Sequence, residues 1–255
     1  MPADALSDEE GGMRGWLIGL AMIVALGAMG GGVLAQDATP AASPVASPLA
    51  DPPGVPQANL GGNAIIPPAM TSALEVVLRG PYDGTRMPIV VRNGTDQPVA
   101  NVKVAITVRD AAGGLLAVGE QEGAFAPYTV APGDAAIGSV LFNGASFGPD
   151  AVLDIAVAGQ VPDERFLTFA DMQVVEFNVQ GDQILAIISN PYDRATAESL
   201  TLGIMCFDAS GNIVAFARDY ASVAAIAAGG TVPVSASLPA GSCDRYAIAA
   251  TALIF

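Results

Sequence analysis

The stretch ILAIISNPYDRATAESLTLGIMCFDASGNIVAF, residues 184–216, decides the fold because its pattern occurs twice in the chain. An earlier copy, PIVVRNGTDQPVANVKVAITVRDAAGGLLAVG, covers residues 88–119. In each copy an apolar run ends in Asn and is followed by a polar loop. An alternating segment that ends in Asp comes next, and a turn of small residues leads into a second apolar run. Such a repetition predicts two structural units of one kind.

The alternating segment carries apolar side chains at every second position. These positions are Val102, Val104, Ile106 and Val108 in the first copy and Leu200, Leu202, Ile204 and Cys206 in the second. A period of two is typical of a strand with one buried face. The pattern therefore predicts two equivalent strands, with these eight side chains pointing inward.

Turn residues follow each alternating segment. Residues 110–114 (DAAGG) and 208–212 (DASGN) combine an Asp with glycine, which favours a hairpin. Further strands are expected over residues 136–142, 151–158, 231–238 and 245–255. Residues 222–228 favour a strand or loop over a helical turn, and no segment has a sustained helical period with caps.

Two strand-rich units predict an all-β fold made of two tandem immunoglobulin-like β-sandwiches. The expected sandwiches cover residues 71–160 and 168–255, and a short polar linker, residues 161–167, joins them. An N-terminal hydrophobic helix and a disordered linker are expected to precede the first sandwich.

The second copy resembles the bacterial FxLYD-type domain. Asn190, the run Cys206-Phe207-Asp208 and Gly211 match that family's pattern. The first copy keeps Asn93, Gly113 and Pro132-Gly133, but its Val108-Arg109-Asp110 lacks the aromatic residue. The resemblance implies an extracytoplasmic β-sandwich and supplies no catalytic residue.

Residues 16–35 (WLIGLAMIVALGAMGGGVLA) form an uncharged apolar run. Val33 and Ala35 fit the −3 and −1 positions of a signal-peptidase site, so cleavage is expected between Ala35 and Gln36. The run is also about long enough to span a bilayer. The segment is therefore either a cleaved signal peptide or an N-terminal membrane anchor, and the mass of the mature protein discriminates between them. Residues 1–12 are acidic, which suggests Met13 as the true start. Either way, we expect an extracytoplasmic protein, secreted or anchored.

Residues 36–70 are rich in proline, alanine and serine and have no apolar period. Such a composition cannot bury enough surface to fold, and its prolines favour an extended chain. This linker is expected to be disordered, either as a stalk that holds the sandwiches away from a surface or as a simple spacer.

Composition excludes several chemistries. The net charge is −15, which repels nucleic acid. The chain has no histidine, which is the usual general base and the commonest metal ligand. Ser146 lies in a G-x-S-x-G motif, but without histidine, and with Pro149 close behind, a glycine-rich loop is the better interpretation than a hydrolase nucleophile.

Acidic residues gather near the predicted turns. They are Asp83, Asp96, Asp110, Asp193 and Asp208. Calcium loops need ligands at alternating positions and a bidentate acid, so we interpret these as solvated turn residues and expect no metal and no cofactor. Tyr82 and Tyr192, each in a Pro-Tyr-Asp run, are candidate contact points because exposed aromatic side chains anchor interfaces.

The two cysteines are Cys206 and Cys243. Outside the cytoplasm they are expected to form a structural disulfide; two free thiols or a redox pair are the alternatives.

These observations predict a non-enzymatic cell-envelope protein with two β-sandwich interaction modules and an unknown protein or envelope partner. The membrane contact, if the apolar segment is uncleaved, is through residues 16–35. The alternatives are an accessory subunit of a membrane complex and a hydrolase that uses carboxylates only.

Overall fold

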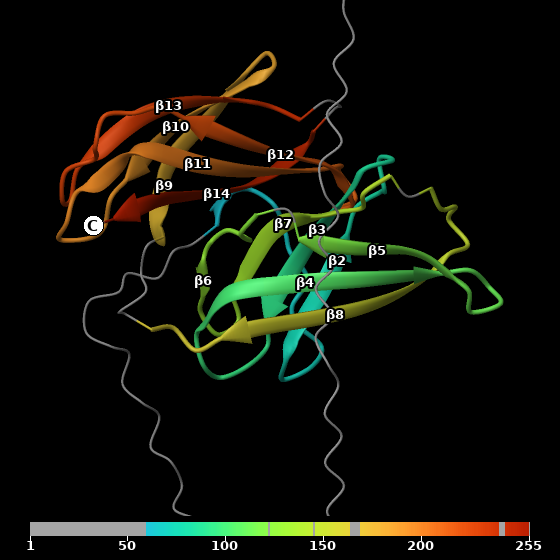
Figure 1. The fold of residues 1–255 in the computed structure, drawn as a ribbon. Coiled ribbons are helices and arrows are strands. Elements are labelled where there is room, and N and C mark those ends of the chain that lie inside the picture. Colours follow the sequence, from blue (N-terminus) through green and yellow to red (C-terminus); the bar gives the residue numbers. More distant parts are fainter. Residues whose placement is uncertain (1–59, 122, 145, 164–168, 240–242, 255) are drawn as a thin grey trace, which may run out of the picture. The chain divides into compact units, whose positions relative to one another are not determined.

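The computed structural model describes residues 60–121, 123–144, 146–163, 169–239 and 243–254 (Figure 1). Within these ranges every regular element is a β-strand, which confirms the all-β fold. The apolar segment 16–35, the cleavage site at Ala35 and Gln36, the linker up to residue 59, and residues 164–168 between the halves lie outside the described residues. The ranges that are described contain no helix long and apolar enough to span a membrane.

The first half of the described chain folds into two antiparallel layers. Its strands are β2 (Leu74–Arg79), β3 (Arg86–Asn93), β4 (Val99–Arg109), β5 (Leu115–Gln121), β6 (Thr129–Val130), β7 (Ala135–Leu141) and β8 (Val152–Gln160). One layer has the order β2-β3-β7 and the other β5-β4-β8, with the short β6 added to β4.

The second half repeats these layers. Its strands are β9 (Phe169–Gln180), β10 (Gln183–Ser189), β11 (Thr196–Phe207), β12 (Ile213–Ala221), β13 (Thr231–Ser237) and β14 (Arg245–Ile254). The layers are β9-β10-β13 and β12-β11-β14, which correspond strand by strand to those of the first half. A two-residue strand, β1 (Gly61–Gly62), pairs with β14.

In each half the two layers are hydrogen-bonded to each other along one edge, which we call the seam. The strands that form the seam differ between the halves. In the first half, β5 pairs with β7 through Glu120 opposite Leu141 and Gln121 opposite Val140. In the second half, β9 is long enough to pair with β10 and then with β14, where Met172 lies opposite Ala250. Equivalent layers are therefore closed by non-equivalent strands.

Each half has its own core between its layers. All eight inward positions predicted from the alternation are buried, with exposures of 2% or less. The first core brings β4 against β3 and β7, and the second brings β11 against β9, β10, β13 and β14. The alternation therefore predicted correctly which face of this strand is buried in each half.

A third apolar cluster, which we name the junction, joins the outer faces of the two halves. It contains Val90, Ala126, Ala135 and Ile137 from the first half and Met205, Phe207, Ile213, Ala247 and Ala249 from the second. Strands β3, β7 and β14 are consequently buried on both faces. Continuous apolar runs in a sequence indicate such strands, and residues 89–91 and 246–250 are runs of this kind.

The end of the predicted disordered linker is ordered, which corrects the prediction for residues 60–70. Backbone N–H groups of Asn63 and Ala64 donate to the carbonyl of Tyr246, at 2.9 and 3.0 Å. Arg92 donates to the carbonyls of Ile66 and Pro67, at 2.5 and 2.9 Å. This segment, the strap, is held because its backbone groups find partners in both halves, which composition does not reveal.

Candidate functional site

The repeated asparagines organise loops. Asn93 and Asn190 are fully buried at the ends of β3 and β10. The Asn190 side-chain amide donates to the carbonyls of Arg194 at 2.7 Å and Ile226 at 3.0 Å, and its oxygen accepts from the N–H of Tyr192 at 3.0 Å. Asn93 makes equivalent bonds in the first half. The repeated Asn therefore reflects loop architecture and is not a ligand site.

The repeated aspartates hold the hairpin turns. The Asp110 carboxylate accepts from the N–H groups of Ala112 at 2.9 Å and Gly114 at 2.7 Å. Asp208 accepts from Asn212 in the same way, and these hydrogen bonds lower the pKa of its carboxyl. Asp83 likewise accepts from Thr85 and Arg86 in its own turn.

The turn acids form no metal-binding cluster within the part of the chain that the structure describes. Asp96 and Asp193 are exposed in the loops that follow β3 and β10. Among the described residues, no three acidic or cysteine side chains come together in a way that would hold a metal ion.

The G-x-S-x-G motif lies in the loop between β7 and β8. Ser146 is exposed, and no helix follows it in the described residues 146–151. A nucleophile elbow needs a strand-turn-helix context and a histidine partner. The geometry fits the interpretation of this motif as a loop.

Phe147 of the same motif belongs to an aromatic cluster at one end of the first half. Its ring stacks on Tyr82, with the ring centroids 4.2 Å apart, and both rings meet Phe142 edge-on. Beside them is a hollow of about 380 Å³ that Arg79 and Leu153 also line. Tyr82 is thus half-buried and serves packing, which corrects its prediction as an exposed contact point.

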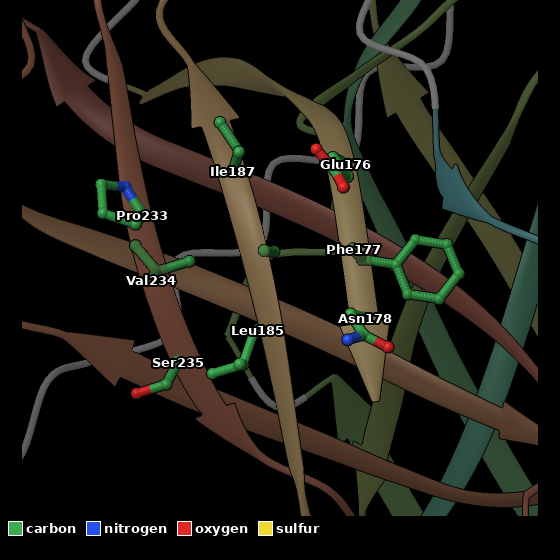
Figure 2. A pocket seen from close by; sticks show the side chains of 9 residues that line it. Glu176, Phe177, Asn178, Leu185, Ile187, Pro233, Val234 and Ser235 are labelled. Carbon is green, nitrogen blue, oxygen red and sulfur yellow. The ribbon is translucent and has the colours of Figure 1, made fainter. Parts of the chain in front are cut away.

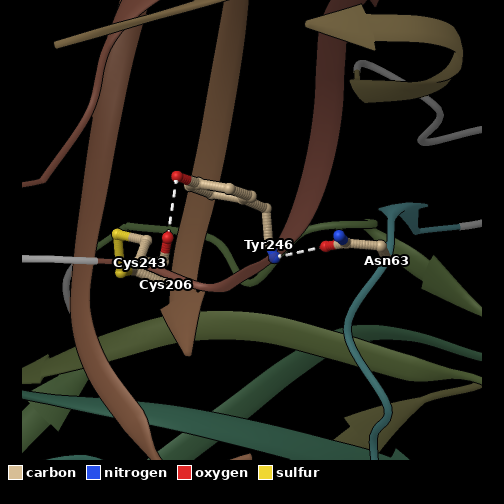
Figure 3. Close-up of a disulfide and its surroundings, with 4 residues drawn as sticks. All are labelled: Asn63, Cys206, Cys243 and Tyr246. Atoms are coloured by element: carbon tan, nitrogen blue, oxygen red, sulfur yellow. Dashed lines mark hydrogen bonds between the residues drawn. A yellow bond between two sulfur atoms is a disulfide. The ribbon is translucent and has the colours of Figure 1, made fainter. Parts of the chain in front are cut away.

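The cysteines form the Cys206–Cys243 disulfide, with Cα atoms 5.4 Å apart (Figure 3). The bond ties the end of β11 to the loop that leads into β14. The hydroxyl of Tyr246 donates to the carbonyl of Cys243 at 3.3 Å, and the N–H of Tyr246 donates to Asn63 of the strap at 2.8 Å. The disulfide therefore stands beside the place where the strap attaches.

The outer face of the β9-β10-β13 layer carries a shallow apolar hollow of about 420 Å³ (Figure 2). Leu185 lies between Asn178 and Ser235 in the ladder, and Ile187 lies between Glu176 and Pro233. We name this surface the β10 face. Its centre is apolar and its margins are polar, which is the composition of a docking surface and unlike that of a catalytic cleft.

Asp171 on β9 is a buried acid that the sequence did not single out. It is 3% exposed and accepts hydrogen bonds from the backbone N–H groups of Tyr128 and Thr129, the latter at 2.8 Å. Both donors belong to the first half. Burial raises the pKa of Asp171 to about 7, and the two N–H donors oppose this rise.

Tyr192 is half-buried against the second core, so it too is no exposed contact point. Burial, and then the charge of Asp171, raise the pKa of Tyr192 to about 12. A further polar contact crosses between the halves where the Arg218 guanidinium donates to the carbonyl of Ala124.

An isolated Asp in a strand is usually solvated, so the alternating pattern alone gave no indication that Asp171 is buried.

Comparison with known proteins leaves the family open. No protein-family model and no curated protein matches the sequence. Among solved structures, red sea bream transglutaminase aligns with a TM-score of 0.20 and 12% identity, over 73% of this chain and 31% of that enzyme's chain. The present chain thus spans about a third of that enzyme's length, and a similarity of this size carries no argument about activity.

Proposed function

We propose that the chain is a non-enzymatic cell-envelope protein, exported or membrane-anchored, which binds a protein partner through the β10 face. The observation that carries this proposal is the exposure of Leu185 and Ile187 side by side on one strand. Each keeps 36% of its surface exposed, and Val175 on the neighbouring β9 keeps 61%. An apolar patch with a polar rim on a rigid sheet is typical of a protein interaction site.

The net charge of the chain limits which proteins the β10 face can bind. At −15 overall, and with Glu176 at the edge of the β10 face, the surface repels acidic proteins. The partner we propose presents an apolar side chain to Leu185 and Ile187, surrounded by neutral or basic residues.

Two further observations support an envelope location and a role without catalysis. A disulfide is typical of oxidising compartments outside the cytoplasm. The absence of histidine from the sequence and the loop context of Ser146 leave no serine hydrolase constellation.

The test is site-specific photo-cross-linking in living cells with the full chain. A photoreactive amino acid replaces Ile187 in one strain and Val118 in a control strain, because Val118 is an exposed apolar residue of comparable kind, 53% exposed, on β5 of the first half. We expect a discrete adduct from position 187 and none from position 118. Adding Leu185→Glu, which places a charge at the centre of the patch, should abolish the adduct.

Equal adducts from both positions, or an adduct that survives Leu185→Glu, would show that the β10 face has no specific partner. Circular dichroism checks that the Leu185→Glu variant is folded. We expect it to be folded, because the side chain lies on the outer face and a charge there leaves the core intact.

A further inference from the structure

Strand β8 is the last strand of the β5-β4-β8 layer and has a free edge (Figure 1). Among the described residues it pairs with β4 alone, with Thr107 opposite Asp154 and Ala105 opposite Ala156. The other layer of this half ends at β2, which has no ladder with β8. The nine residues Val152–Gln160 therefore leave one side of a strand available for pairing with a further strand.

The hydrogen bonds of β4 determine which backbone groups of β8 point outward. The N–H groups of Asp110 and Val104 donate toward β5, to the Gly114 carbonyl at 2.9 Å and the Gln121 side chain at 3.1 Å. Even-numbered residues of β4 thus bond toward β5 and odd-numbered residues toward β8, because the direction alternates along an antiparallel strand. The odd-numbered residues of β4 stand opposite the even-numbered residues of β8. The central residues of β8 whose N–H and C=O groups point away from β4 are therefore Leu153, Ile155 and Val157.

The side chains of these three residues are apolar and only half-buried. They pack against the core of the first half from its margin, whereas Ile106 of the central strand β4 is fully buried. The strand contains neither proline nor lysine, and its charged residue, Asp154, pairs with Arg109 at 3.3 Å on the outer face. The proline, the lysine and the inward-pointing charge that usually keep an edge from pairing are thus absent from β8.

The free edge of β13 in the second half does carry such features. The Leu238 N–H and the Gly230 carbonyl bond to residues that flank β10, so the odd-numbered residues between them point outward. Pro233 is one of these residues and has no N–H to donate. The outward N–H of Ser237 donates to the Asp219 carboxylate of β12 at 3.0 Å. The edge of β13 is therefore blocked, whereas the edge of β8 is open.

We propose that β8 is a dimerisation edge, on which β8 of a second copy of this chain pairs antiparallel about a two-fold axis at Ile155. In this register Ile155 meets its own counterpart, and Leu153 meets Val157 of the second copy. The half-buried apolar side chains then cover one another, and Asp154 lies opposite Ala156 of the second copy. The contact is one strand wide, so we expect a reversible dimer. It is independent of the β10 face.

Neighbouring registers fit less well. A two-fold axis at Asp154 sets the two carboxylates directly opposite each other, which is destabilising in a ladder. An axis at Ala156 sets Leu153 opposite Gly159, which has no side chain to cover it. Pairing about Ile155 avoids both defects, so the edge is complementary to itself, as an isologous dimer requires.

The experiment is sedimentation equilibrium of the full chain in a mild detergent, which accommodates the apolar segment 16–35. Physiological salt screens the repulsion between two chains that each carry a net charge of −15. We expect the mass to rise from that of one chain toward that of two between low-micromolar and near-millimolar concentration. Amide exchange is the second readout. The Ile155 N–H should gain protection as concentration rises, whereas the Ala156 N–H, which points toward β4, should be protected throughout.

Charge at position 156 tests the register. Ala156→Glu sets a carboxylate opposite Asp154 of the second copy at two symmetric places and should weaken the dimer about tenfold. Ala156→Lys sets an ammonium group there and should strengthen the dimer. Ala105→Glu is the matched control, because Ala105 lies opposite Ala156 on the same exposed face but one strand further from the second copy, at about 10 Å. This control should leave the dimer unchanged.

A monomer at every concentration would overturn the proposal. Equal weakening by Ala156→Glu and Ala105→Glu would overturn it as well, and so would weakening by Ala156→Lys, since neither fits pairing about Ile155. A dimer that all three variants leave unchanged would place the contact elsewhere in the chain and would also count against β8. Should a variant fail to fold, the concentration dependence of the Ile155 amide in the wild type decides the matter by itself.

Discussion

Asn93 and Asn190 show how one side chain can organise a loop twice in the same chain. Each is buried where a strand ends and donates to one carbonyl of the loop that follows it and to one carbonyl of a segment more than 30 residues away in the sequence. The sequence indicates that the position matters, because it recurs in both copies. The purpose was not predictable, since the partner carbonyl of Ile226 lies 36 residues away along the chain.

Replacing Asn190 with Ala is expected to lower the free energy of unfolding by about 2–3 kcal/mol. The change removes the donor to the carbonyls of Arg194 and Ile226 and the acceptor of the Tyr192 N–H. Urea unfolding followed by circular dichroism measures the loss. Asn212→Ala, at an exposed turn, should cost under about 1 kcal/mol; equal costs for the two variants would refute a special contribution from the buried amide.

The burial of Asp171 could not be predicted from the residues next to it in the sequence. It follows Ala170 and precedes Met172 in a strand, and nothing local distinguishes it from an acid on a solvated face. Its burial results from a segment of the other half that folds over it. Ser146 shows the opposite case, because the lack of any histidine already argued against its motif.

At the scale of elements, the alternating strands β4 and β11 were predictable because each has one face in a core. Strands β3, β7 and β14 carry apolar side chains on both faces, one toward a core and one toward the junction. The strap was not predictable, because a glycine pair in a proline-rich segment has no local reason to form a strand. Its order depends on the free edge of β14.

Gly62→Val is expected to detach the strap. Gly62 has a φ of +111°, and a Cβ there would lie 2.1 Å from the carbonyl oxygen of Tyr246. The lost pairing should reduce the free energy of unfolding by about 1–3 kcal/mol, measured by urea unfolding. Gly84→Val is the matched control, since Gly84 has a φ of +95° and open space around it. A Gly62→Val variant as stable as Gly84→Val would mean that the strap adds nothing.

At the scale of the whole molecule, the halves are separate in their cores but share the junction. The expected boundaries of the two sandwiches, at residues 71, 160 and 168, stay predictions, as do the export segment and the stalk. Ile137 of the first half packs with Met205 and Phe207 of the second half. Each half therefore shields part of the other half's outer face from water. Two copies of one pattern predict two units, but the faces with which the units meet depend on residues scattered over several strands.

Reducing the Cys206–Cys243 disulfide tests this coupling. The bond closes 37 residues and should contribute about 4 kcal/mol through the unfolded chain. We expect a reductant to lower the melting temperature by roughly 10 °C. Because the junction couples the halves, NMR signals of Val104 in the first core and Leu202 in the second should disappear together. Melting of Leu202 ahead of Val104 would show instead that the halves unfold independently.

The different seams have a consequence for the kinship of the two copies. Strand β9 serves both layers of its half, whereas its counterpart β2 serves one, and β7 closes a seam that β13 leaves unpaired. If β2 and β9 were exchanged, the second half would lose the strand that pairs with both of its layers. The first half would gain a strand whose second pairing has no partner. The two copies are therefore no longer interchangeable, because the strands that connect the layers differ between them.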